Sequence, residues 1–353
     1  MATIADDVAP CAPYNVKYVW AISLAAAMGG LLFGYDTAVI AGAIGFLQKR
    51  FALTPIEEGW AAASALAGCV LGAALAGTIS DHLGRRRMLM IAAVLFLVSA
   101  VGTAVPPTLF WFDLFRLLGG IGVGAASMCS PMYIAEISPA RIRGRMVSLN
   151  QLAIVFGMLA VYFVNYHIAS LGDEAWNVQT GWRWMFGSEA IPAVALLFLL
   201  LLVPESPRWL TQQRRHAEAV EVLTRINGPA QAEREMAEIE LAIASESSSL
   251  KQLLLPGMRL ALALGVVLAV LQQVTGINVF LYFAPEIFKN MSGAESGAAL
   301  LQTIVVGAVN MLFTVVAIWT VDRWGRKPLM ILGFSGMGTC LLFLGLAAYL
   351  QRP

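Results

Sequence analysis

The sequence predicts an all-α integral membrane protein, and three observations support this prediction. Hydrophobic residues make up 59% of the 353 positions and charged residues only 13%, about half the ~25% typical of soluble domains. The mean hydropathy is +0.74. The apolar residues also gather in long runs without period-2 alternation, which is the pattern of membrane helices and not of a membrane β-barrel. A disordered chain and an ordinary soluble enzyme are excluded.

Nine apolar runs have the ~20 residues that a helix needs to cross a bilayer. They cover residues 18–45, 59–79, 88–106, 109–134, 147–169, 185–203, 258–284, 298–320 and 329–350. A hydrophilic segment divides them into six runs and then three. The predicted organisation is a tail at 1–17, a six-helix half at 18–203, a loop with short helices at 204–257, and three further helices at 258–353.

The basic residues predict the orientation of the chain. With a cytoplasmic N-terminus, most of the 23 Lys and Arg residues fall in cytoplasmic segments, among them Arg85–Arg87 and the cluster at 141–145. Cytoplasmic loops carry the excess of positive charge in membrane proteins. We therefore expect a multi-pass protein of the cell membrane with its N-terminus inside. The net charge of +1 argues against nucleic acid as a partner.

Catalytic residues, metal sites and cofactors are not predicted. The four Cys residues form no CxxC pair, and none of the three His residues has a metal-ligand neighbour at helical spacing. The sequence contains no nucleophile–base arrangement and no nucleotide-binding loop. We expect a non-enzyme that uses a gradient, such as a proton gradient, as its energy source.

A short motif occurs twice. Asp81, Gly84 and Arg85 stand between the second and third runs, and the same Asp-x-x-Gly-Arg pattern returns at Asp322 and Arg326, between the eighth and ninth. Repetition at the same place in the helix count indicates a duplicated six-helix half, which is a common transporter design. The motif either anchors the topology or closes a gate through ion pairs.

These motifs and four others resemble the sugar porter family of the major facilitator superfamily, and within it the bacterial xylose–proton symporters. The other matching segments are PMYIAE at 131–136, RIRG at 141–144, PESPRWL at 204–210 and QQVTGIN at 272–278. The resemblance implies two six-helix halves that alternate access to a central sugar site. Twelve helices are implied and nine are present, six plus three. We therefore expect residues 1–353 alone to insert but to take up no sugar until three further helices are supplied.

Two ionisable residues lie inside the apolar runs. A charge in a membrane span is energetically unfavourable, so its presence indicates a function. Asp36 lies ~20 Å before Lys49, and Arg116 lies ~12 Å inside the outer end of the fourth run, so the two side chains are at matching depth. They form either a static ion pair or a proton site. By resemblance, an acid and an Arg at these places couple protons in the symporters, whereas passive facilitators have Asn in place of the acid.

Amides and aromatic rings are the side chains expected to bind a sugar, which has many hydroxyls and no charge. Gly276 is expected to open the seventh run and let its amides converge. By resemblance, the sugar-contacting amides are Gln151, Gln272, Gln273 and Asn278, and Phe33 and Tyr282 are candidate aromatic walls. Helix packing is the alternative role for each of them. Met158 stands where the xylose symporters have a second Gln, so the sugar is not fixed by the resemblance.

A charge network is expected at the cytoplasmic ends of the helices. By resemblance it joins Asp81, Arg85, Glu136 and Arg143, with Glu189 and Arg208 as extensions and Asp322 and Arg326 as the second copy.

The function expected from the sequence is monosaccharide transport, of a pentose or hexose, by proton symport. A passive sugar facilitator and a non-transporting sensor or inactive fragment are the alternatives. The expected partners are a monosaccharide, protons and the lipid bilayer.

Overall fold

The protein is an all-α membrane protein whose computed structural model describes residues 14–245, 256–292 and 296–350. The first five helices are α1 (Val16–Phe51), α2 (Pro55–Leu83), α3 (Arg85–Ala104), α4 (Leu109–Ile137) and α5 (Arg143–Ser170). The sixth span consists of α6 (Glu174–Trp176), a π-helical turn (Asn177–Gly181), α7 (Trp182–Gly187) and α8 (Ala190–Leu202). The connecting segment contains α9 (Pro207–Gln212), α10 (His216–Asn227) and α11 (Pro229–Ser245). The last elements are α12 (Pro256–Val274), α13 (Ile277–Ser292), α14 (Ser296–Trp324) and α15 (Arg326–Leu350).

The predicted membrane helices are present. Within the described residues, 8 helices are long and apolar enough to cross a membrane, and Lys327–Phe343 of α15 forms a shorter apolar helix. Most of the predicted tail, 1–17, lies outside the described residues.

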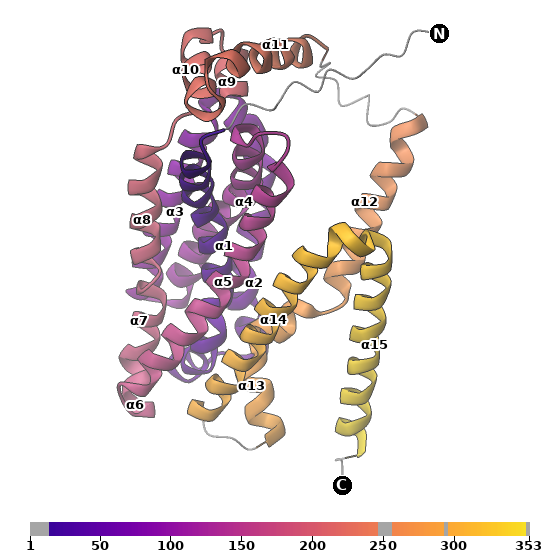
Figure 1. The fold of residues 1–353 in the computed structure, drawn as a ribbon. Helices are drawn as coiled ribbons and strands as arrows, with labels where there is room; N and C mark the ends of the chain where they lie inside the picture. The colour runs from indigo at the N-terminus through magenta and orange to yellow at the C-terminus, as the bar shows by residue number, and fades with distance from the viewer. Residues whose placement is uncertain (1–13, 246–255, 293–295, 351–353) are drawn as a thin grey trace.

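Helices α1 to α5, α7 and α8 form one bundle (Figure 1), and small residues let its backbones touch. A Cβ on Gly34 of α1 would lie 1.9 Å from the Ile154 carbonyl oxygen of α5, and one on Gly157 would lie 2.1 Å from the Leu31 carbonyl oxygen. Gly120 of α4 approaches the Ala65 carbonyl of α2 in the same way. Since lipid supplies no hydrophobic force between membrane helices, such close packing is what holds them together.

The short helices α9 to α11 cover one end of this bundle (Figure 1). The helix α10 buries Ala219, Leu223 and Ile226, and it ends where Gly228 takes φ 80°. The arginines Arg85–Arg87 and those at 141–145 lie in or next to the helix ends at this side, which is called the arginine-rich end below.

The last helices are arranged less compactly. The helices α13 and α14 pack against α1 and α5, whereas α12 and α15 stand away from the bundle (Figure 1). The seventh run, predicted as one helix, is interrupted at Thr275–Gly276, where Gly276 takes φ +77°. This break confirms the predicted opening at Gly276 and gives α12 and α13 separate ends.

The helix contact at Gly157 predicts a stability effect. We expect Gly157→Ala to lower the free energy of unfolding by about 1–3 kcal/mol, because the new methyl group would force the α1 backbone away. Gly333→Ala is the matched control, since no atom lies within 4 Å of the Cβ it would add. Thermal unfolding in detergent checks this. Equal transition temperatures for the two variants would contradict the packing role of Gly157.

Candidate functional site

A buried ion pair lies inside the six-span bundle. Arg116 Nη1 of α4 donates to Asp36 Oδ1 of α1 at 2.7 Å and to the Asp36 backbone oxygen at 3.2 Å. Both side chains are only 1% exposed. The pairing inferred from their matching depth is thus present. In a low-dielectric surrounding neither charge is stable without the other, so the pair joins two helices that are distant in sequence.

Glycine and aromatic residues shape the pocket around this pair. A Cβ on Gly119 would be in ordinary contact with Asp36 Oδ1, at 3.4 Å, but too close to Ser99 Oγ, so the absence of a side chain at 119 lets α3 approach α4 beside the ion pair. The Arg116 guanidinium lies 5.6 Å from the ring centre of Phe186 on α7. This cation–π contact partly offsets the loss of water around the charge.

Glu189 belongs to this pocket, and its predicted place in the charge network at the helix ends is wrong. Its residue is 1% exposed, and its carboxyl faces Asp36 and interacts with Arg116. The reason is depth, because Glu189 precedes Pro204 by roughly 15 residues, which is about 22 Å of helix. The span is also interrupted between α7 and α8, at Ser188.

Two carboxyl groups therefore face one guanidinium. Asp36 Oδ2 and Glu189 Oε1 receive no hydrogen bond from any N–H or O–H donor of the described residues. A hydrogen bond between two carboxyl groups requires a proton on one of them. The pocket is a place where protons can bind.

The candidate sugar residues are only partly brought together. Across the break between α12 and α13, Asn278 Nδ2 donates to Gln273 Oε1 at 2.7 Å, so these two amides converge as predicted. Gln272 and Gln151 have exposed side chains, and among the described residues neither makes a hydrogen bond to that amide pair.

The two candidate aromatic walls lie in one apolar cluster. Tyr282 is 6% exposed and packs in the cluster that Phe33 borders and that includes Met158. Tyr282 also interacts electrostatically with Asp36 and Arg116. The helix α13 therefore carries both a candidate sugar amide, Asn278, and a tyrosine ring, Tyr282, that interacts electrostatically with the buried ion pair.

The charge network at the arginine-rich end forms around Arg85, which is 4% exposed. Arg85 Nε donates to both carboxylate oxygens of Glu136, at 3.1 and 3.3 Å, and Nη1 lies 3.1 Å from Asp81 Oδ1. Arg143 and Arg208 line a cavity together with Glu136. The side chains of Asp322 and Arg326 lie outside the described residues.

Glu205 is a further residue of this network, and it was not predicted from the sequence. Its carboxylate accepts the backbone N–H groups of Arg85 and Arg86 at 3.0–3.2 Å and that of Ser206 at 2.9 Å. A carboxylate suits the positive end of the α3 dipole. Its place in the PESPRWL motif was the only indication of a role, and the motif does not show which groups Glu205 binds.

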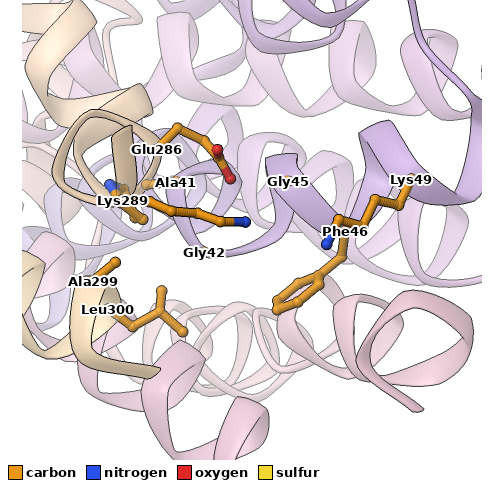
Figure 2. A pocket seen from close by; sticks show the side chains of 10 residues that line it. Ala41, Gly42, Gly45, Phe46, Lys49, Glu286, Lys289, Ala299 and Leu300 are labelled. Carbon is orange, nitrogen blue, oxygen red and sulfur yellow. The ribbon is translucent and has the colours of Figure 1, made fainter. Parts of the chain in front are cut away.

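Cavities lie at both ends of the protein. Near the arginine-rich end, a cavity of about 1030 Å³ lies between Trp20, Leu152 and Trp319, on α1, α5 and α14. At the opposite end, the cavity between α1 and α13 is about 30 Å³. Figure 2 shows Glu286, Lys289 and Lys49 around this small cavity, and Lys49 is also paired with Glu174. A further cavity of about 600 Å³ lies beside it, lined by residues of α1, α5 and the start of the sixth span.

The helix bundle, the buried ion pair and the broken helix beside it define a membrane transporter. A family model described as sugar (and other) transporter matches residues 22–353. The chain belongs to this sugar transporter family of the major facilitator superfamily.

Curated relatives and solved structures similar to this chain support the same family. The chain is 48% identical to the D-xylose-proton symporter of Escherichia coli, covering 96% of this chain and 74% of that protein. It is 43% identical to the arabinose-proton symporter of Bacillus subtilis, covering 96% and 73%. A structure of the E. coli xylose transporter in a partially occluded inward open conformation matches with a TM-score of 0.85 and 45% identity, covering 95% of this chain and 80% of that one.

The buried position of Arg85 predicts that its acid partner matters for stability. We expect Glu136→Ala to lower the free energy of unfolding by about 3 kcal/mol, because it leaves a buried guanidinium with only the exposed Asp81 as partner. Glu218→Ala removes a carboxylate that pairs with Arg215 at 43% and 53% exposure, and should change stability by at most about 0.5 kcal/mol. Denaturant unfolding of both variants measures these changes. Similar losses of unfolding free energy in the two would mean that the buried Arg85–Glu136 pair stabilises the fold no more than an exposed pair does.

Proposed function

We propose that the protein is a monosaccharide–proton symporter that works by alternating access. The single observation that carries the proposal is the buried group of Asp36, Arg116 and Glu189. Its relatives include symporters of xylose, arabinose and galactose with protons, which supports a pentose or hexose as substrate.

Charge balance explains how this group takes up a proton. With one proton shared between Asp36 and Glu189, the remaining negative charge balances Arg116 and the pocket is neutral. A further proton leaves Arg116 without an ionised partner in the pocket, a state that is unstable in a dry interior. Binding of this proton therefore changes the forces between α1, α4 and α8, and these are the forces that a coupled transporter needs to change.

The sugar and proton sites are coupled through α13. Asn278 at the start of this helix and Gln273 before the break offer donors and acceptors to hydroxyls. Tyr282, four residues after Asn278, interacts with the ion pair. Movement of α13 when sugar binds would alter the surroundings of Asp36. Half-helices that end near the middle of the membrane are the usual way in which transporters build such sites.

The arginine-rich end is assigned to the cytoplasm. The excess of Arg in short loops at this end supports the assignment. The cavity of about 1030 Å³ then faces the cytoplasm, and those of about 30 and 600 Å³ lie at the outer end. The N-terminus is inside in this orientation, and the protein lies in the cell membrane.

Passive sugar transport is the second candidate. A facilitator needs no group that binds and releases protons, whereas this chain holds two carboxyl groups with unsatisfied oxygens in one buried pocket. Burying these carboxyl groups is unfavourable by several kcal/mol, which argues that they have a function. Proton flux during sugar uptake separates the two functions.

The first functional prediction concerns coupling. Asp36→Asn should abolish uphill sugar accumulation and spare sugar exchange at equal concentrations, because Asn keeps the shape but binds no proton. Accumulation and counterflow in membrane vesicles measure the two activities. If uphill accumulation survives the change, Asp36 does not couple the proton.

The second functional prediction concerns the sugar amides. Gln272→Ala and Gln273→Ala should each weaken sugar binding roughly 2- to 12-fold, since one hydrogen bond to a neutral hydroxyl contributes about 0.5–1.5 kcal/mol. Gln179→Ala, in the exposed π-helical turn, serves as the control. Calorimetric titration with a panel of pentoses and hexoses gives the affinities. Unchanged affinity for every bound sugar would remove that residue from the site.

A further inference from the structure

Asp113 is a half-buried acid that has no part in the mechanism proposed above. It lies on α4, three residues before Arg116, which places the two side chains on the same helix face about 5–6 Å apart at Cβ. Its Oδ1 is buried and receives no hydrogen bond from the described residues. An unpartnered carboxylate oxygen inside a membrane span is unfavourable unless a cation is within reach.

Arg116 has a donor to spare on the same side of the pocket. Its Nη1 is used by Asp36, whereas its Nε is buried and makes no hydrogen bond within the described part of the chain. Side chains of a helix tilt toward its N-terminus, so the guanidinium of Arg116 leans back toward Asp113. The unsatisfied donor and the unsatisfied acceptor are therefore neighbours on one helix.

The other charged groups near Asp113 lie on several helices. On α4 itself Arg116 is the nearest charge, and Glu57 at the exposed start of α2 acts on Asp113 electrostatically. The helix α3 carries no charged residue between 88 and 104. From the remaining neighbours come Asp36 on α1, Glu189 at the start of α8 and the exposed His167 on α5. Arg116 is the one cation among them inside the pocket.

We propose that Asp113 is the alternate counter-ion of Arg116, to which the guanidinium moves when Asp36 and Glu189 both carry protons. The inference rests on the symport function proposed above. Asp113 is a positioning residue in this scheme, since it contacts neither sugar nor the transported proton. It acts by stabilising the protonated form of the pocket, in which Arg116 would otherwise lack an ionised partner.

The proposal predicts a shift in the pH dependence of transport. Without the Asp113 charge, the second proton binds less readily, so uphill accumulation needs a more acidic outside solution. The Asp113→Asn variant should need roughly tenfold more external protons for half-maximal accumulation. Sugar counterflow at equal pH on both sides should stay close to wild type, which a general structural defect would not allow.

Matched variants make the test specific. Asp113→Glu should restore the wild-type pH profile, since it returns the carboxylate. Glu57→Gln should leave the profile unchanged, because Gln also serves in the helix-capping position that Glu57 fills beside Thr54. Asp113→Ser repeats the neutralisation with a smaller side chain, so the test stands if one neutral variant fails to insert.

The outcomes separate this inference from the function on which it rests. If wild type accumulates sugar and Asp36→Asn does not, symport holds, and a wild-type pH profile in Asp113→Asn then overturns the role of Asp113 alone. If wild type shows no proton-driven accumulation, symport and the role of Asp113 fall together. A profile shifted to acid pH in both neutral variants and restored in Asp113→Glu supports the proposal.

Discussion

The positive charge of Arg116 in the interior of the bundle is the constraint on which the rest of the site depends. An unpaired guanidinium at this depth is costly, so an acid must reach it from another helix. Asp36 reaches it from α1, and Glu189 faces the same pocket from the junction of α7 and α8. One buried charge thus determines the positions of α1, α4 and the junction of α7 and α8.

The interruptions in the helices follow from the same physics. A membrane helix satisfies its own backbone, and a break exposes N–H and C=O groups that need partners. The break at Thr275–Gly276 lies where Gln273 and Asn278 supply polar side chains, and Thr275 Oγ1 donates to the Gln272 carbonyl oxygen at 2.6 Å. The break in the helix and these polar side chains therefore occur together.

Sequence reasoning predicted the membrane spans and the Asp36–Arg116 pair because hydropathy and residue depth along a straight helix are local properties. It misplaced Glu189 because that role was carried over from the family resemblance, whereas counting residues from Pro204 already set it deep in the bundle. Asp113 and Glu205 were not identified, since their meaning lies in atoms of other helices or in unsatisfied oxygens that no spacing reveals. Gln273 and Asn278 converge only because Gly276 takes positive φ, which the sequence allows but does not require.

The small size of the cavity between α1 and α13 has a consequence for the membrane as a whole. A continuous column of water would conduct protons along its hydrogen bonds and discharge the membrane potential. The space of about 30 Å³ between these two helices has room for about one water and for no column. The contact of α1 with α13 is therefore an electrical seal that limits proton leakage along this interface.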